Sequence, residues 1–374
     1  MIKNIYLFFL SFKNLFVFFS INRSFKNIIF YSEKNTYRFY YQPLIDLLLK
    51  NKKKFIYLTS DYDDKFENDN IKDLYIGNGL AFLIITNFIN CDNLIMTLTD
   101  LNNNNFKKSL FCKNYVYIFH SLVSTYKYYT EGAFDNYDKI FCCGKYQVEE
   151  ILKREKIKKL KKKTLINTGY LFLDYLDKKI KEKNSSSPSK KILFATTWNK
   201  NKQGLINRDI EKVFDNLLKK NQIIFRPHPE DRIRNRPTIE LIQNKYGNNK
   251  NFFFDKNVEN FKSLNESCLM ITDAGGIFLE YMLAFKKPVI FIDGYEKIHN
   301  PYHSSIGSQS FEEMVKSKIA LSIAAEDLKN IESHIQACLS EKYLNDLEEK
   351  IEELNNLMPN RGRVAETMYK QLVG

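Results

Sequence analysis

The protein has 374 residues, enough for two domains of ordinary size. Hydrophobic residues make up 44% and charged residues 27% of the chain, a balance that excludes a disordered protein. Its 13 glycines and 8 prolines are too few for a collagen-like or low-complexity chain. The net charge of +13 fits either a solvated basic face or attraction to an anionic membrane surface, and no nucleic-acid-binding motif accompanies it.

The first apolar segment, residues 5–21, is rich in Phe and Leu but is interrupted by Lys13 and Asn14. It has no small-residue cleavage site, so we do not expect a secretory signal. It is also short for a membrane span, which needs about 20 apolar residues. We expect a helix that lies in the membrane interface, and a true anchor and an ordinary buried helix are the alternatives. The basic residues placed near the headgroups are Lys3, Lys13, Arg23 and Lys26.

From residue 27 onward, short apolar runs alternate with stretches of helical spacing. This alternation predicts an α/β fold with parallel strands buried on both faces. The strands expected in the first half are 27–31, 54–59, 93–97, 115–119, 139–143 and 163–168, with helices at 41–50, 80–88 and from about 146.

A Ser/Pro-rich stretch, residues 183–189, marks the predicted domain boundary. The alternation then restarts and predicts a second sheet with strands at 191–195, 222–225, 251–254, 268–272 and 288–292, and helices that include 209–219 and 277–285. We therefore expect an N-terminal membrane-proximal segment (1–26), a first domain (27–183), a second domain (184–343) and C-terminal helices (344–374).

The cysteines and the acidic residues give no strong metal signal. Asp61, Asp63 and Asp64 follow a predicted strand and have the oxygen ligands of a cation site, but an ordinary polar loop has the same composition. We predict neither a metal nor a cofactor. The cysteines show no C-x-x-C pairing and no histidine at zinc spacing, so a reduced, cytoplasmic compartment fits best; they are Cys91, Cys112, Cys142, Cys143, Cys268 and Cys338.

Polar residues that directly follow strands are the candidates for a ligand site, because open α/β sheets bind ligands at the carboxyl ends of their strands. In the second domain three such loops are expected to converge on one crevice. Their candidate donor-binding and catalytic residues are Thr196 and Thr197 after the first strand, Arg226 and His228 after the second, and Asp273, Gly275 and Gly276 after the fourth.

The Asp273 segment has the features of a phosphate site at the start of a helix. Asp273 can cap the helix, and Gly275 and Gly276 let a phosphate approach the N–H groups of its first turn. Glu280, two turns on, can accept hydrogen bonds from ribose hydroxyls. An ordinary capped helix that packs through its glycines is the alternative.

The sequence R-P-H-P, residues 226–229, fixes two functional side chains in a rigid loop. Arg226 can hold a phosphate through two hydrogen bonds, and His228 can donate a proton or hydrogen bond to a leaving phosphate. In the first domain, His120 follows a strand and is the candidate general base, with a structural histidine as the alternative. His299 and His303 lie in a later loop, which either covers a donor or is an ordinary surface loop.

The motifs resemble those of the CDP-glycerol glycerophosphotransferases of teichoic-acid and capsule synthesis. The resemblance lies in I-L-F-A-T-T-W (192–198), R-P-H-P (226–229), I-T-D followed by L-E-Y (271–281) and K-P-V-I-F (287–291), with I-F-H-S (118–121), C-G-K-Y (143–146) and T-G-Y-L-F-L-D (168–174) in the first domain. The chain departs from the family at Phe119 and Ser121, where Trp and Gly are usual. It also departs at 274–276, where a glycine pair resembles that of nucleotide-sugar epimerases and some glycosyltransferases.

The resemblance implies a GT-B-like fold, with two Rossmann-like domains facing across a cleft and a C-terminal helix that returns to the first. The first domain would bind the acceptor and the second the nucleotide donor. The resemblance also implies inverting transfer without an essential metal, and peripheral attachment to the cytoplasmic face of the membrane. His120 would be the catalytic base, and Arg226, His228 and Asp273 would belong to the donor site.

The expected function is transfer of a glycerol-phosphate, or a related polyol-phosphate, from a CDP-activated donor to a hydroxyl of a glycan or lipid-linked acceptor. Three alternatives stay open: a GT-B glycosyltransferase that uses a nucleotide sugar, a nucleotide-sugar epimerase, and a non-catalytic membrane-bound binding protein. The expected partners include an anionic membrane surface and no nucleic acid.

Overall fold

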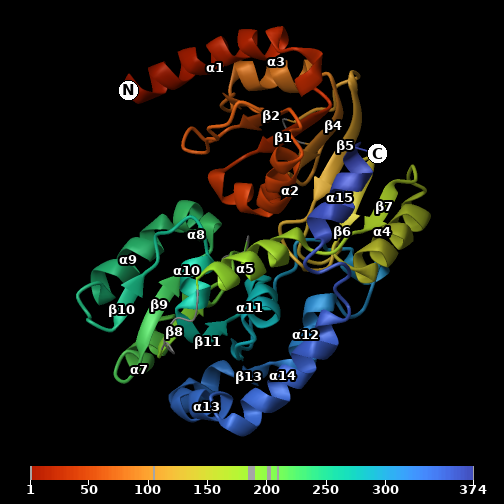
Figure 1. Ribbon diagram of the computed structural model, residues 1–374. Coiled ribbons are helices and arrows are strands. Elements are labelled where there is room, and N and C mark those ends of the chain that lie inside the picture. The colour runs from red at the N-terminus through yellow and green to blue at the C-terminus, as the bar shows by residue number, and fades with distance from the viewer. Residues whose placement is uncertain (1, 104–105, 184–189, 200–203, 209, 374) are drawn as a thin grey trace. The chain divides into compact units, whose positions relative to one another are not determined.

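A computed structural model of the protein describes residues 2–103, 106–183, 190–199, 204–208 and 210–373 (Figure 1). The chain divides into two units. Unit 1 comprises Met1–His120, Tyr129–Tyr175 and Met358–Gly374, and unit 2 comprises Ser121–Tyr128 and Leu176–Leu357.

Unit 1 is built on a parallel sheet that has, in the described ranges, seven strands in the order β3-β2-β1-β4-β5-β6-β7. β1 and β2 are buried along their whole length, as expected for parallel strands covered by helices on both faces. The strands are β1 (Ile28–Ser32), β2 (Phe55–Thr59), β3 (Ile71–Tyr75), β4 (Cys91–Met96), β5 (Cys112–Ile118), β6 (Lys139–Cys142) and β7 (Thr164–Asn167).

Helices surround this sheet, and the core between them contains α2, α15 and the inner strands. The last helix, α15, contributes Val364 and Met368 to that core. The helices are α1 (Ile2–Ser20), α2 (Arg38–Lys50), α3 (Leu80–Phe88), α4 (Lys145–Lys158), α5 (Leu171–Glu182, which continues into unit 2) and α15 (Val364–Val373), with short 3₁₀ turns η1 (Arg23–Phe25) and η2 (Asn35–Tyr37).

The N-terminal helix α1 packs on α3 and β3 (Figure 1). It buries Leu15 and Phe18 and leaves several aromatic side chains exposed, among them Phe8, Phe9 and Phe16. None of the helices in the described ranges is long and apolar enough to cross a lipid bilayer.

Unit 2 has its own parallel sheet, with six strands in its described part, in the order β10-β9-β8-β11-β12-β13. A second hydrophobic core surrounds Phe194, Phe214 and Phe225. The strands are β8 (Lys191–Ala195), β9 (Gln222–Arg226), β10 (Phe252–Phe254), β11 (Ser267–Thr272), β12 (Val289–Ile292) and β13 (Leu321–Ile323).

The helices of unit 2 connect these strands and continue after the last one. They are α6 (Leu205–Arg208), α7 (Ile210–Leu217), α8 (Pro229–Arg234), α9 (Arg236–Tyr246), α10 (Phe261–Asn265), α11 (Ile277–Phe285), α12 (Phe311–Ile319), α13 (Ile331–Cys338) and α14 (Glu341–Asn355), with 3₁₀ turns η3 (His303–Ser305) and η4 (Ala325–Asn330).

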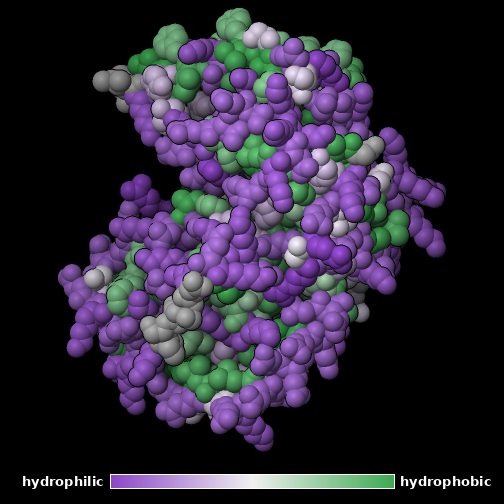
Figure 2. Space-filling model, in the orientation of Figure 1, coloured by the Kyte–Doolittle hydropathy of each residue, from purple (hydrophilic) through white to green (hydrophobic). Residues whose placement is uncertain are grey.

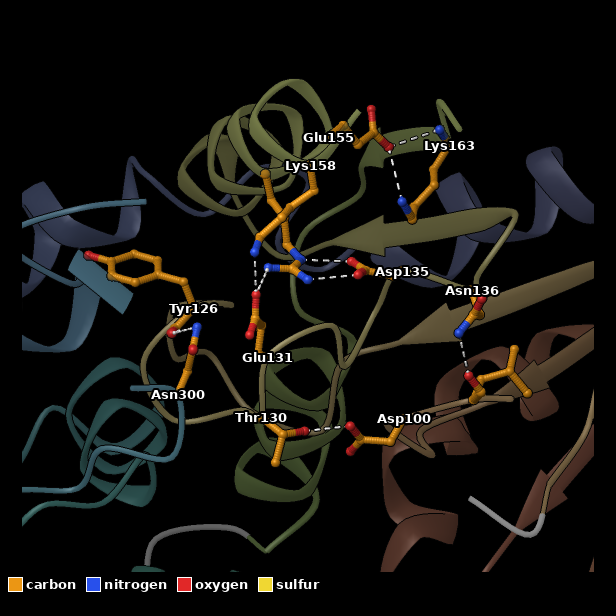
Figure 3. Close-up of polar contacts among 12 residues, drawn as sticks. Asp100, Tyr126, Thr130, Glu131, Asp135, Asn136, Glu155, Lys158, Lys163 and Asn300 are labelled. Atoms are coloured by element: carbon orange, nitrogen blue, oxygen red, sulfur yellow. Dashed lines mark hydrogen bonds and ion pairs between the residues drawn. The ribbon is translucent and has the colours of Figure 1, made fainter. Parts of the chain in front are cut away.

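The segment Ser121–Tyr128 leaves unit 1 directly after β5 and is bonded into unit 2. The N–H of Ser124 donates to Oε2 of Glu312 at 2.8 Å, and its hydroxyl accepts the N–H of Phe311 at 2.7 Å. The side-chain amide of Asn300 donates to the carbonyl of Tyr126 at 3.0 Å (Figure 3). Backbone and side-chain bonds therefore fix this short segment on unit 2.

Where the chain re-enters unit 1, ion pairs fix it to α4 and a hydrogen bond fixes it to the loop after β4 (Figure 3). Arg154 bonds both carboxylate oxygens of Asp135, at 2.8 and 2.7 Å, and Lys158 pairs with Glu131 at 2.8 Å. The hydroxyl of Thr130 donates to Asp100. Because an Arg–carboxylate pair with two hydrogen bonds fixes both the distance and the relative orientation of its two side chains, the segment that re-enters unit 1 is held in one position on α4.

Candidate active site

The loops that follow β8 and β11 meet through the carboxylate of Asp273. This side chain is buried, and its two oxygens accept the N–H of Thr197 at 2.8 Å and the N–H of Leu205 at 3.2 Å. Burial raises the pKa of Asp273, and these N–H groups oppose that rise. Of the three loops predicted to converge, these two meet within unit 2.

Asp273 does not cap the helix that follows it, so that prediction is wrong. α11 begins at Ile277, its N-cap is Gly276, and no side chain accepts a hydrogen bond there. The carboxylate is instead occupied by N–H groups of the loop after β8 and of α6.

The two glycines after Asp273 allow close packing of other segments. A Cβ on Gly275 would lie 2.5 Å from Oγ1 of Thr197, and a Cβ on Gly276 would overlap the hydroxyl of Ser121. Protein atoms therefore occupy the space that a side chain would need. Packing therefore accounts for the missing side chains at both positions, and a role of the glycines in phosphate binding stays a prediction.

Arg226 ends β9 and is buried in contacts with the loop after β10. Its guanidinium pairs with Asp255 at 2.5 Å and donates to the carbonyls of Asn257 and Val258 at 3.1 Å each. Burial would raise the pKa of Asp255, but Arg226 and the N–H of Asn257 outweigh it and the pKa is lowered. To bind a donor phosphate, Arg226 would therefore have to use guanidinium N–H groups other than those that bond Asp255, Asn257 and Val258.

His228 is the N-cap of α8, and its Nδ1 accepts the N–H of Glu230 at 3.1 Å. Because Nδ1 acts as an acceptor, the neutral ring carries its proton on Nε2. The fold thus prepares Nε2–H of His228 as a hydrogen-bond donor. This tautomer is the one that donation to a leaving phosphate requires.

Glu280 and Thr196, the remaining candidates of unit 2, are both buried. Glu280 lies in α11, and the side-chain amide of Asn260 donates to it at 3.3 Å. Thr196 follows β8, and its hydroxyl has no hydrogen-bond partner among the described residues.

Several residues of this region were not found from the sequence. Asp231, three residues after His228, is fully buried, and burial raises its pKa to about 7. Part of the Lys297 side chain is exposed, but its ammonium group is buried. Burial lowers the pKa of this ammonium to about 8, although the nearby carboxylates of Asp273, Asp231 and Glu312 act to raise it. An acidic residue on a short helix and a lysine in a loop give no sequence signal, because their burial depends on the tertiary fold.

His299 contacts the loop after β8. Its ring meets that of Trp198 edge to face, with centroids 5.3 Å apart, and the guanidinium of Arg234 also lies over the Trp198 ring, 5.5 Å from its centroid. The N–H of His299 also donates to the carbonyl of Lys127 at 3.0 Å. His303 lies further along, in η3.

In unit 1, His120 lies two residues after the end of β5, among tyrosine rings. Its Nδ1 is 3.4 Å from the hydroxyl of Tyr117, and its ring meets those of Tyr37, Tyr40 and Tyr129 at centroid distances of 5.4, 6.1 and 6.0 Å. The aromatic surroundings hold the imidazole in one orientation. A fixed ring orientation is what a general base needs.

The acidic cluster after β2 is used in local hydrogen bonds. The carboxylate of Asp61 accepts the N–H groups of Asp63 and Asn35, both at 3.0 Å, and that of Asp64 is buried and accepts the hydroxyl of Tyr57 at 2.7 Å. Across the described ranges, no group of three or more ligand side chains is arranged to hold a metal ion.

Known proteins give an independent comparison. Residues 130–318 match the family model of CDP-Glycerol:Poly(glycerophosphate) glycerophosphotransferase. Among solved structures, the wall teichoic acid polymerase TagF, soaked with CDPG, is 14% identical with a TM-score of 0.58, and the match covers 99% of this chain and 94% of TagF. A search of curated proteins found no match.

Two epimerases have a similar fold. UDP-GlcNAc 2-epimerase from Neisseria meningitidis, bound to UDP-GlcNAc, is 14% identical with a TM-score of 0.59 over 92% of this chain and 98% of its own. The enzyme from Methanocaldococcus jannaschii is 15% identical with a TM-score of 0.58 over the same shares. These likenesses confirm the predicted GT-B-like α/β fold, with one parallel sheet in each unit.

Proposed function

Because this chain belongs to the CDP-glycerol:poly(glycerophosphate) glycerophosphotransferase family, we propose that it moves a glycerol-phosphate, or a related polyol-phosphate, from a CDP-activated donor to an acceptor hydroxyl. The observation that carries this proposal is the family match over 130–318, which includes both the R-P-H-P loop and the Asp273 loop. The CDPG soak of TagF supports a CDP-activated donor. The acceptor would be a glycan or lipid-linked chain in cell-surface polysaccharide synthesis.

In the proposed reaction, the acceptor hydroxyl gives its proton to Nε2 of His120. The acceptor oxygen bonds to the β-phosphorus of the donor. The bond from that phosphorus to the bridging oxygen breaks, and CMP leaves with the bridging oxygen. Nε2–H of His228 hydrogen-bonds the departing phosphate and stabilises its charge.

The other candidates of unit 2 have supporting roles in this proposal. Thr196 and Thr197 provide hydroxyl and N–H groups after β8, and Arg226 adds positive charge after β9. Asp273 holds the loop geometry through the N–H of Thr197. Gly275 and Gly276 directly precede α11, and Glu280 would bind ribose hydroxyls.

We also propose that the enzyme works at the cytoplasmic face of the membrane as a peripheral protein. The exposed aromatic side chains of α1, such as Phe9 and Phe16, support this location, because a helix with an apolar face binds in the headgroup region.

A ligand screen by thermal shift tests the donor. At about 100 times its dissociation constant, a ligand stabilises the fold by about 2.7 kcal/mol. We expect CDP-glycerol and CDP to raise the melting temperature more than UDP or UDP-GlcNAc, and CMP to appear when an acceptor is added. Stabilisation by UDP-sugars with no CMP release would instead support a glycosyltransferase or an epimerase. Stabilisation by no nucleotide would support the non-catalytic alternative.

A further inference from the structure

The edge at which the strands of unit 1 begin is strongly basic. Because the strands are parallel, their first residues lie along one edge of the sheet. Lysine or arginine occurs within five residues of the start of each described strand of unit 1 except β4. We call the following residues the basic rim: Lys72 in β3, Lys52, Lys53 and Lys54 before β2, Arg23 and Lys26 before β1, Lys113 in β5, Lys139 in β6, and Lys161 and Lys162 before β7.

Contacts between rim residues show that they share one surface. The ammonium groups of Lys54 and Lys72 both lie over the ring of Phe25, at 5.4 and 5.3 Å. Arg23 and Lys113 both pair with Asp92, at 2.9 and 2.8 Å. Basic side chains from separate strands are therefore gathered along one edge.

An apolar tip projects from the middle of this rim. In the strand register, Cys91 of β4 stands opposite Cys112 of β5, whereas the first residue of β4 opposite β1 is Asn93. At this edge β4 and β5 therefore begin about two residues, ~7 Å, before β1 does. The turn at the start of β5 contains Leu110 and Phe111, which are 97% and 55% exposed. Phe88, at the end of α3, is exposed three residues before β4. We call Phe88, Leu110 and Phe111 the apolar tip.

The exposed face of α1 reaches the same edge. Arg23, three residues after the end of α1, donates to the side chain of Asn90 at 2.9 Å, directly before β4. Figure 2 shows green, apolar side chains among purple ones on the side where α1 and α3 lie in Figure 1. Scattered apolar side chains are normal on a protein surface. A helix that exposes several Phe side chains and ends beside a basic edge is a pattern of membrane-binding proteins.

We propose that the basic rim and the apolar tip dock unit 1 on an anionic lipid bilayer, with Leu110 and Phe111 below the headgroups. This inference rests on the membrane location in the proposed function and names the surface that provides it. Lysines attract anionic lipid, and apolar tip residues gain free energy from the acyl region. A second copy of the chain fits less well, because its rim would present the same positive charge.

The docking also sets the direction of unit 1. His120 follows the opposite end of β5, whose seven residues span about 23 Å. His120 would then lie about 20 Å or more from the headgroups. The acceptor hydroxyl would belong to a chain that extends from its lipid, rather than to a lipid headgroup in the bilayer.

Sedimentation with vesicles tests the docking on the full chain. The vesicles are pure phosphatidylcholine, or phosphatidylcholine with about 30% phosphatidylglycerol, at low and high salt. The rim variant carries Lys52→Glu, Lys161→Glu and Lys162→Glu, which are exposed. We expect its binding to anionic vesicles to fall by at least about 100-fold, from the roughly fivefold that each lysine near the surface contributes.

The tip variant, Leu110→Ser with Phe111→Ser, should also bind vesicles more weakly than the wild type. This difference should remain at high salt, because it comes from apolar contacts. The matched control carries Lys219→Glu, Lys220→Glu and Lys250→Glu, exposed residues of unit 2, and should bind within about threefold of the wild type. Circular dichroism and melting temperature confirm that each variant is folded.

Three results would overturn the docking proposal. They are equal loss in the rim and control variants, equal binding of wild type to neutral and anionic vesicles, and a dimer in solution that the tip variant abolishes. The test is independent of the donor: rim and tip variants should transfer to a soluble acceptor at the wild-type rate, so loss of vesicle binding and loss of transfer are separate outcomes.

Discussion

The hydroxyl of Tyr117 lies 3.4 Å from Nδ1 of His120, three residues further along the chain at the end of β5. Tyr117 is fully buried, and burial holds its pKa well above the ordinary tyrosine value, so its hydroxyl stays protonated. A phenol oxygen can accept Nδ1–H, and in this tautomer Nε2 is the basic nitrogen of His120. In the proposed reaction Tyr117 is therefore a positioning residue for the base.

Replacing Tyr117 with Phe should lower kcat and leave KM for the donor nearly unchanged. Loss of one net hydrogen bond, about 0.5–1.5 kcal/mol, corresponds to a roughly 2- to 10-fold slower reaction. The acid limb of the pH profile of kcat should move to lower pH, because the oxygen that accepts from protonated His120 is gone. A purely structural Tyr117 would change the melting temperature without moving this limb. His120→Ala is the reference and should lower kcat by about 10²–10⁴.

Two variants of His228 separate its capping role from its chemical role. Asn at an N-cap still accepts the N–H of Glu230, whereas Ala does not. We expect His228→Ala to lose about 1 kcal/mol of unfolding free energy and His228→Asn to lose little. Both should lose about 10²-fold or more in kcat, because neither can donate from Nε2. Urea unfolding and steady-state kinetics check this pair, and full activity in His228→Asn would remove His228 from the reaction.

Asp231 should make the protein less stable as the pH rises. Its pKa is about 7 in the folded protein and about 3.9 in the unfolded chain. Between these values the folded state keeps a proton that the unfolded chain releases, so stability is lost as the pH rises from about 4 to about 7 and then stays level.

Replacing Asp231 with Asn removes this dependence and keeps the acceptor for the amide of Asn235. We expect the difference in unfolding free energy between the variant and the wild type to rise, in favour of the variant, by up to about 2–3 kcal/mol between pH 5 and pH 8. Urea unfolding at both pH values measures the gain. Asp327→Asn, on an exposed carboxylate of the same unit, is the control and should show no comparable change.

Gly275→Ala should destabilise unit 2 by about 1–3 kcal/mol, because the new Cβ would lie 2.5 Å from Oγ1 of Thr197. Adding Thr197→Ala removes that oxygen, so a double-mutant cycle should show a coupling of about 0.5–3 kcal/mol. Additive effects of the two changes would contradict the contact. If the double variant regains stability but not transfer, the loop has a donor-binding role in addition to packing.

The sheets could be predicted from the sequence because their inner strands are continuous apolar runs. β3 and β13 were missed: β3 contains Lys72 and Asp73, β13 has three residues, and both are edge strands with one neighbour. An edge strand needs less apolar surface, so its composition is close to that of a loop.

The candidate site was predicted in part. The carboxyl ends of parallel strands lie at the same edge of a sheet, which predicts that the loops after β8 and β11 meet. Thr197 and Asp273 of these loops are hydrogen-bonded to each other. The partner of Arg226 could not be predicted, because Asp255 lies 29 residues further along and reaches it only through strand pairing. Roles for the site residues stay predictions that the variants above test.

The excursion of Ser121–Tyr128 has a consequence for how this protein can change over generations. Unit 2 is not encoded by one continuous stretch, because its contact to Glu312 comes from Ser124, on the far side of residues that belong to unit 1. An exchange of residues 176–357 between homologues, which takes two crossovers, would bring a foreign partner to Ser121 and Ser124. The exchanged unit would keep these contacts only if its residues at Gly276, which leaves room for Ser121, and at Glu312 matched this eight-residue segment, so unit 2 cannot be inherited as a simple cassette.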